Sequence, residues 1–126
     1  MQSNQINLDF IKKAQANFEE YRQNLDTEQE KTGAIHAFEY CYELSWKLMK
    51  RTLQSRGLEC GSPKDTFRKS LAEGLITDIN LWFEFLEIRN MTSHDYNLLI
   101  QDECIAIFEK FSIELERLIQ KIQTLI

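Results

Sequence analysis

Apolar residues recur at steps of three and four through most of the chain, the spacing of amphipathic helices. The pattern predicts a first helix over residues 8–25, a second from about Glu28 to Ser55, and a last from about Asp102 to Thr124. Two neighbouring apolar stripes run along the second segment. Because two stripes make a wide apolar face, we expect this helix to touch several neighbours and to be the central element.

Turn signals predict a short helix between the second and last helices. Ser62 suits the N-cap, Pro63 suits the first helical position, and Gly74 suits the end. We expect this short helix to bury Phe67 and Leu71. A further helix is predicted to begin after Thr77-Asp78 and to lead into residues 89–96.

These elements predict an all-α fold, an antiparallel four-helix bundle with a short extra helix, in a single domain over residues 1–126. Gly57, after Arg56, is expected to close the second helix with a left-handed residue. The hydrophobic fraction of 43% and the aromatic fraction of 11% fit a folded globular chain.

The formal net charge of −5 argues against broad nucleic-acid binding, which depends on basic surfaces. A local site for one phosphate remains compatible with it. Cys41, Cys60 and Cys104 are widely spaced without a CxxC pair, which argues against disulfides and zinc. We therefore expect no metal, no cofactor and reduced thiols. The polar residues 1–7 and the lack of a long apolar run predict a soluble cytoplasmic protein.

Candidate chemistry is concentrated between Arg89 and Tyr96. Arginine can bind phosphate bidentately, histidine can move protons near neutral pH, and a phenol can act as a nucleophile or accept a modification. In an uninterrupted helix Arg89 and His94 would lie about 140° apart. Asn90 and Ser93 are weak helix formers, so a helix end here would let His94 approach Arg89.

Other interpretations of the polar residues stay open. Residues 89–96 can be a surface loop in which Arg89 pairs with Glu87 or Asp95, His94 is solvated and Tyr96 packs on the bundle.

Three basic residues near the start of the short helix, Lys64, Arg68 and Lys69, form a candidate anion-binding group or merely a solvated face. His36 falls on the polar side of the second helix, where we expect a solvated residue.

An ordered set of residues across 34–96 resembles the nucleotidyltransferase substrate-binding protein family, a branch of the HEPN superfamily close to HepT-type toxins. The set comprises Phe38-Glu39-Tyr40, Glu43-Leu44, Trp46-Lys47, Ser62-Pro63-Lys64-Asp65, Phe67-Arg68, Gly74-Leu75-Ile76, Asp78, Trp82, Leu86-Glu87, Arg89-Asn90, Ser93-His94 and Tyr96.

The resemblance implies a helical bundle that forms a homodimer and has a minimal nucleotidyltransferase of the MntA type as partner. In HepT-like members the Arg-x4-His-x-Tyr motif is a ribonuclease site formed where two protomers meet. By position, Arg89 and His94 would be catalytic, Asn90 would support them, and Tyr96 would accept AMP from the partner.

Three functions are compatible with these observations. The first is a metal-independent ribonuclease toxin silenced by AMP transfer to Tyr96. The second is a non-catalytic subunit that binds a substrate or nucleotide for a separate nucleotidyltransferase, and the third is a plain dimerisation protein. The acidic composition favours the second and the complete motif favours the first, which we prefer.

Overall fold

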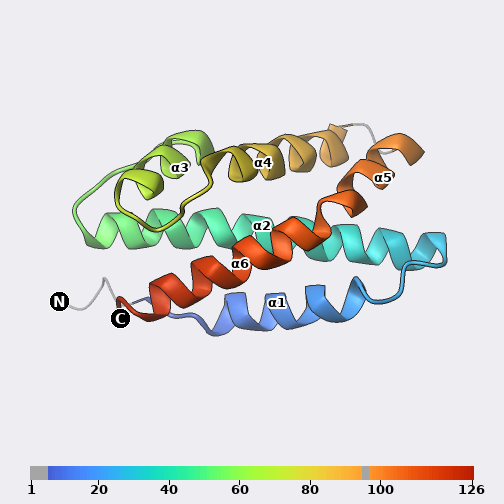
Figure 1. Ribbon diagram of the computed structural model, residues 1–126, viewed down its shortest axis with the longest axis horizontal. Helices are drawn as coiled ribbons and strands as arrows, with labels where there is room; N and C mark the ends of the chain where they lie inside the picture. The colour runs from blue at the N-terminus through green and yellow to red at the C-terminus, as the bar shows by residue number, and fades with distance from the viewer. Residues whose placement is uncertain (1–5, 95–96) are drawn as a thin grey trace.

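The computed structural model describes residues 6–94 and 97–126, where every regular element is a helix (Figure 1). The helices are α1 (Asp9–Tyr21), α2 (Glu28–Ser55), α3 (Pro63–Ala72), α4 (Ile79–His94), α5 (Leu98–Ala106) and α6 (Phe108–Gln123). The predicted all-α bundle is confirmed. None of these helices is long and apolar enough to cross a membrane.

Helix α2 is the central element, as predicted, because it contacts each of the other five helices. In Figure 1 it lies between α3 and α4 on one side and α1 on the other, and α6 crosses it obliquely. Its first turn is closed by a capping box: the Thr27 hydroxyl accepts from the Glu30 N–H, and the Glu30 carboxylate accepts from the Thr27 N–H. Gly57 follows the helix with φ of +82°, the expected left-handed residue.

The predicted caps of α3 and α4 are also present. The Ser62 side chain accepts from the Asp65 N–H at 3.2 Å, with Pro63 in the first turn. Asp78 accepts from the Leu81 N–H, also at 3.2 Å, at the start of α4. The sequence therefore positions both helices through local hydrogen bonds.

Three predicted details are wrong. The last helix begins earlier, at Leu98, because the Asn97 side chain caps it, and it is broken at Ile107 into α5 and α6. At the break the Ile107 N–H bonds to Cys104 O, a tighter turn than an α-helix makes.

Helix α1 ends at Tyr21, although Leu25 still packs on the core. In α3, Leu71 is 40% exposed, whereas Thr66, Phe67 and Ser70 are buried.

An aromatic cluster fills the core where α2, α4 and α6 meet. The Phe111 ring is fully buried, and its centroid lies 4.9 Å from that of Phe38, 5.2 Å from Phe85 and 5.5 Å from Phe18. These contacts are edge-to-face, the geometry that aromatic rings prefer. Phe111 therefore ties α1, α2, α4 and α6 together.

The three cysteines are buried and unpaired. Burial raises the pKa of both the Cys41 and Cys104 thiols to about 12. Both thiols stay protonated at neutral pH and pack as the small core residues the sequence predicts.

Phe111→Ala should lower the free energy of unfolding by about 3–5 kcal/mol, because it removes a ring from a closed core. Phe10→Ala is the matched control, since Phe10 is 69% exposed and its loss should change stability by no more than about 0.5 kcal/mol. Urea denaturation of both variants measures the difference, and similar losses would contradict the central role of Phe111.

Candidate functional site

The candidate motif is helical up to His94, since α4 continues from Ile79 to that residue. The hydroxyls of Thr92 and Ser93 bond to the carbonyls of Arg89 and Asn90 within the same helix. These short polar side chains therefore do not end α4 before His94. Arg89 and His94 stay on different faces, and one protomer does not bring them together.

Arg89 faces α2 rather than its neighbours in sequence. Its Nη1 lies 3.8 Å from Glu39 Oε2, and its Nε lies 3.9 Å from Glu43 Oε2. The pairing with Glu87 considered above is therefore replaced by pairing with two carboxylates of α2. Asp95 and Tyr96 lie outside the described residues.

The Arg89 guanidinium is charge-balanced but has hydrogen-bonding capacity left. Its side chain is 26% exposed, and its Nε is buried without a hydrogen-bond partner among the described residues. Distances of 3.8–3.9 Å to Glu39 and Glu43 exceed hydrogen-bond length. The buried Nε is out of reach of an incoming ligand, so donation to a phosphate would fall to the two terminal nitrogens of the planar fork.

Glu39 connects the polar groups of this region. Its Oε2 accepts from the Thr92 hydroxyl at 2.6 Å and lies near Arg89, while its Oε1 lies 3.6 Å from His36 Nδ1. Glu43 is held on its other side by the Trp46 indole, whose Nε1 is 3.3 Å away. Sequence analysis assigned no role to Glu39, Glu43 or Thr92.

A small pocket of about 280 Å³ opens between α2 and α4 at these residues. Its lining consists of Ile35, His36, Glu39, Arg89, Thr92 and Ser93. His36, predicted as a solvated residue, is 73% exposed but lies at the edge of this pocket. His94 is exposed at the end of α4 and does not line the pocket.

The candidate anion-binding residues lie elsewhere, in a groove of about 480 Å³ between α3 and α4. Lys64 and Arg68 line it together with Asn90, Glu84 and Glu87, among others. The Arg68 guanidinium lies 5.7 Å from the Phe83 ring centroid. Asn90 thus points to the groove rather than to the pocket of Arg89.

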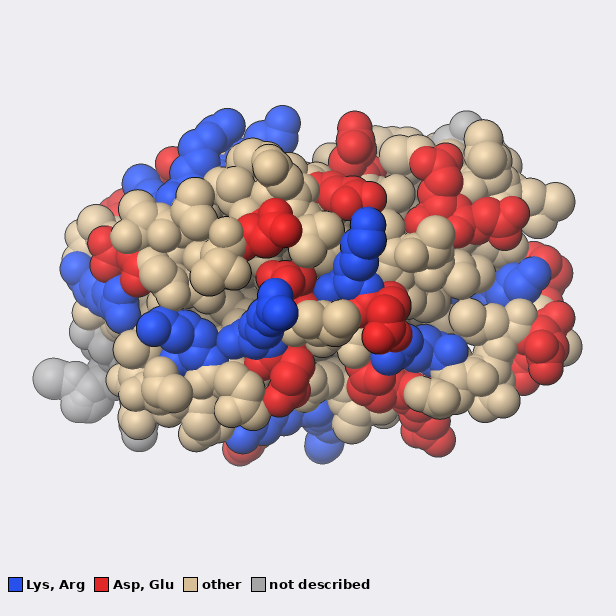
Figure 2. Space-filling model, viewed as in Figure 1, with Lys and Arg blue, Asp and Glu red and all other residues tan. Residues whose placement is uncertain are grey.

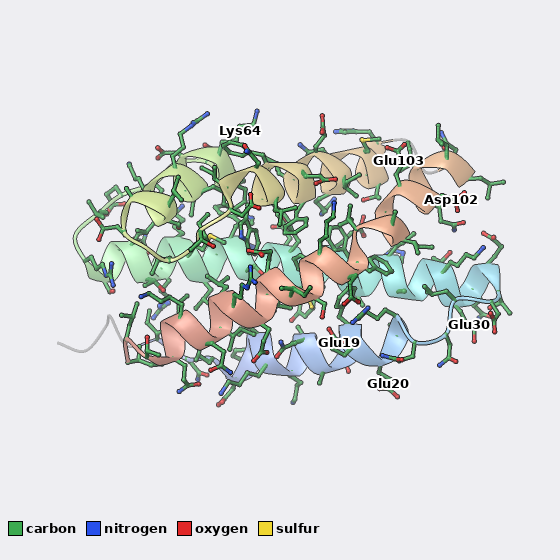
Figure 3. The ribbon with its side chains drawn as sticks, viewed as in Figure 1. Glu19, Glu20, Glu30, Lys64, Asp102 and Glu103 are labelled. Atoms are coloured by element: carbon green, nitrogen blue, oxygen red, sulfur yellow. The ribbon has the colours of Figure 1, made fainter. Side chains whose placement is uncertain are left out.

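Charge is unevenly distributed between the two ends of the α3–α5 layer. Figure 2 shows Lys and Arg atoms over α3 and Asp and Glu atoms over α5. Lys64 lies at the outer surface of α3, and Asp102 and Glu103 lie on α5 (Figure 3). Lys69 is engaged by Asp65 and by the Glu59 carbonyl, so it does not join Lys64 and Arg68 as a free cation.

The arrangement offers no evident metal site. Within residues 6–94 and 97–126, no group of three or more His, Cys, Asp or Glu side chains is placed to hold a metal ion. The chemistry available is that of an arginine, carboxylates, hydroxyls and an imidazole.

The protein is an all-α helical bundle whose candidate polar residues lie on α4, with Arg89 facing α2. The family model described as "nucleotidyltransferase substrate binding protein like" matches residues 7–124. The chain belongs to this nucleotidyltransferase substrate-binding family.

Known proteins of several bacteria are similar to this chain. A probable ribonuclease HepT from Haemophilus influenzae is 36% identical over 99 residues, which cover 72% of this chain and 66% of that protein, just under two thirds.

Solved structures share the fold. A Thermus thermophilus protein has a TM-score of 0.82 at 28% identity, over 88% of this chain and 97% of that one. A Haemophilus influenzae substrate binding domain of a nucleotidyltransferase has a TM-score of 0.82 at 29% identity, over 93% and 99%. An AMPylated HEPN toxin from Shewanella oneidensis, solved with its MNT antitoxin, has a TM-score of 0.73 at 17% identity, over 92% and 98%.

Thr92→Val should destabilise the fold by about 1–3 kcal/mol, because Glu39 loses the hydroxyl that donates to it. Thr124→Val is the control, since the exposed Thr124 hydroxyl bonds only to the carbonyl of Lys121 in the last turn. Thermal and urea denaturation at neutral pH compare the two. Equal stability of both variants would show that the Thr92–Glu39 contact contributes nothing.

Proposed function

We propose that this chain is a HepT-like toxin, a metal-independent ribonuclease that acts in the cytoplasm as a homodimer. Its partner is a minimal nucleotidyltransferase of the MntA type, which silences it by transferring AMP to Tyr96. The observation that carries the proposal is Arg89, whose half-buried guanidinium has donors to spare in a chain similar to a probable ribonuclease HepT.

Cleavage of RNA by its own 2′-hydroxyl needs only proton transfer and charge stabilisation. The 2′-oxygen of RNA loses its proton and attacks the adjacent phosphorus, the bond to the 5′-oxygen breaks, and that oxygen takes a proton. Arg89 binds the non-bridging oxygens as negative charge develops, and His94 transfers a proton. Asn90, beside Arg89 in sequence, would support RNA binding by hydrogen bonding from the α3–α4 groove.

A homodimer would bring Arg89 and His94 together although they are separated within one protomer. Because α4 holds them on different faces, a second copy related by a two-fold axis is needed to bring Arg89 of one protomer to His94 of the other. Leu98 and Leu99 are 68% and 69% exposed immediately after the motif, an apolar surface that a second copy would cover. The aromatic residues Trp82 and Phe85 of α4 are buried in the core and do not contribute.

Lys64 and Arg68 extend the proposed contact with RNA. Both line the α3–α4 groove with Asn90, the neighbour of Arg89 in sequence, and in this proposal a flanking phosphate binds there. Glu84 and Glu87 border the same groove and limit it to a small anion rather than a long polyanion. Their role is anion binding, not catalysis.

In this proposal, AMP transfer to Tyr96 silences the ribonuclease through charge. The phenol oxygen of Tyr96 attacks the α-phosphorus of ATP, pyrophosphate leaves and the phenol proton is lost. The bound AMP then places an anion close in sequence to Arg89, where it competes with RNA for the guanidinium. The Shewanella oneidensis toxin with its antitoxin supports a pairing of this kind.

A second candidate function is a non-catalytic subunit that binds the substrate of a nucleotidyltransferase. The family description and the Haemophilus influenzae substrate binding domain favour it. In that case Arg89 binds a nucleotide phosphate and no RNA is cleaved.

Arg89→Ala and His94→Ala should each lower the rate of RNA cleavage by about 10²–10⁴-fold, with EDTA having no effect on the wild type. Lys110→Ala, an exposed charge on α6, serves as the surface control and should cleave normally. Gel analysis of a labelled RNA incubated with the purified chain reports the rates. A wild type that binds nucleotide but leaves RNA intact would support the non-catalytic subunit instead.

Incubation with the cognate nucleotidyltransferase and ATP should add AMP-sized mass to the wild type and abolish its ribonuclease activity. Tyr96→Phe should gain no such mass and should keep its activity, because it lacks only the acceptor oxygen. Intact-protein mass spectrometry measures the addition. Mass gained equally by the variant would place the acceptor on another residue.

A further inference from the structure

Cleavage of RNA by its own 2′-hydroxyl requires two proton transfers, one from the 2′-oxygen and one to the departing 5′-oxygen. The sequence contains two histidines, His36 and His94. The pocket that contains Arg89 is bordered by His36 and not by His94. A site within one protomer therefore pairs Arg89 with His36.

The geometry links these two residues through one carboxylate. His36 Nδ1 lies 3.6 Å from Glu39 Oε1, and Arg89 Nη1 lies 3.8 Å from Glu39 Oε2. With Nδ1 facing Glu39, the other ring nitrogen, Nε2, is the one that can meet a substrate. At 3.6 Å this contact is longer than a hydrogen bond, so Glu39 lies beside the imidazole without fixing it.

The exposure of His36 and Arg89 and the volume of their pocket suit a bound phosphodiester. His36 is 73% exposed at the mouth of the pocket, whereas Arg89 is 26% exposed within it. The pocket of about 280 Å³ is many times the roughly 30 Å³ of a water molecule. Thr92 and Ser93 add hydroxyls to its wall.

We propose that His36 and Arg89 together bind one phosphodiester of RNA, and that His36 is a second proton-transfer group of the site. This inference rests on the proposed ribonuclease function. His36 gives a proton to the 5′-oxygen as its bond to phosphorus breaks, and His94 of the second protomer in the proposed homodimer takes the proton of the 2′-hydroxyl. The products are a 2′,3′-cyclic phosphate and a free 5′-hydroxyl, so protons and bonds balance.

The first test is cleavage of a labelled RNA across a range of pH. His36→Ala should cut the rate by about 10²–10⁴-fold and remove one limb of the pH–rate profile, since one proton-transfer group is lost. The charged groups bordering the pocket, Glu39 and Arg89, are unchanged in this variant. Gln54→Ala, at an exposed position near the end of α2, is the matched control and should keep the wild-type rate and profile.

Wild-type rate and pH profile in His36→Ala would overturn the inference. Unchanged circular dichroism of both α2 variants is expected, because both side chains are exposed.

The second test does not depend on cleavage. Imidazole NMR resonances are followed while a dinucleotide with 2′-deoxyribose at the scissile position is added. The His36 signals should shift in a saturable way in the wild type and in Gln54→Ala, but not in Arg89→Ala.

The two tests separate the two proposals. A His36 response in a chain that cleaves no RNA would keep the phosphodiester site and overturn the ribonuclease function. Cleavage without a His36 response would keep the ribonuclease and overturn the site.

Discussion

The contact of α2 with every other helix constrains the whole molecule, including its candidate chemistry. The apolar stripes of α2 are buried in the core, so its remaining polar residues lie along the boundaries with its neighbours. Glu39 and Glu43 lie on the boundary with α4, where Arg89 arrives from the other side. The position of the arginine is therefore a consequence of helix packing rather than of the local motif.

The two carboxylates beside Arg89, the arginine proposed to bind phosphate, have opposite effects. A half-buried guanidinium without a counter-charge would destabilise the fold, and Glu39 and Glu43 prevent this. The same carboxylates repel an approaching phosphate. Because their distances to Arg89 exceed hydrogen-bond length, they balance its charge while leaving its donors available. Thr92 donates to Glu39 Oε2 and so partly neutralises that carboxylate at the wall of the pocket.

The sequence predicted those features that depend on neighbours in the chain. The caps at Ser62 and Asp78 are local hydrogen bonds, and apolar spacing was sufficient to identify α2 as central. The break at Ile107 was missed because no glycine or proline marks it, and the apolar spacing continues across it.

The candidate site was less predictable, because its contacts join residues far apart in the chain. The Arg89–Glu39 pair spans 50 positions, and nothing in the spacing of residues 89–96 indicates it. His36 was assigned to a solvated face because a helical pattern separates apolar from polar positions only. Such a pattern does not show which polar residues of one helix lie beside polar residues of another, as His36 lies beside the pocket of Arg89.

The net charge of −5 does not conflict with an RNA substrate once the location of the charges is considered. Affinity for long nucleic acid grows with the number of phosphates neutralised, so an acidic chain binds a polyanion weakly overall. Cleavage requires only that one phosphate be held correctly. The basic surface of α3 and the acidic surface of α5 would favour a short segment at one end and repel the strand at the other (Figure 2).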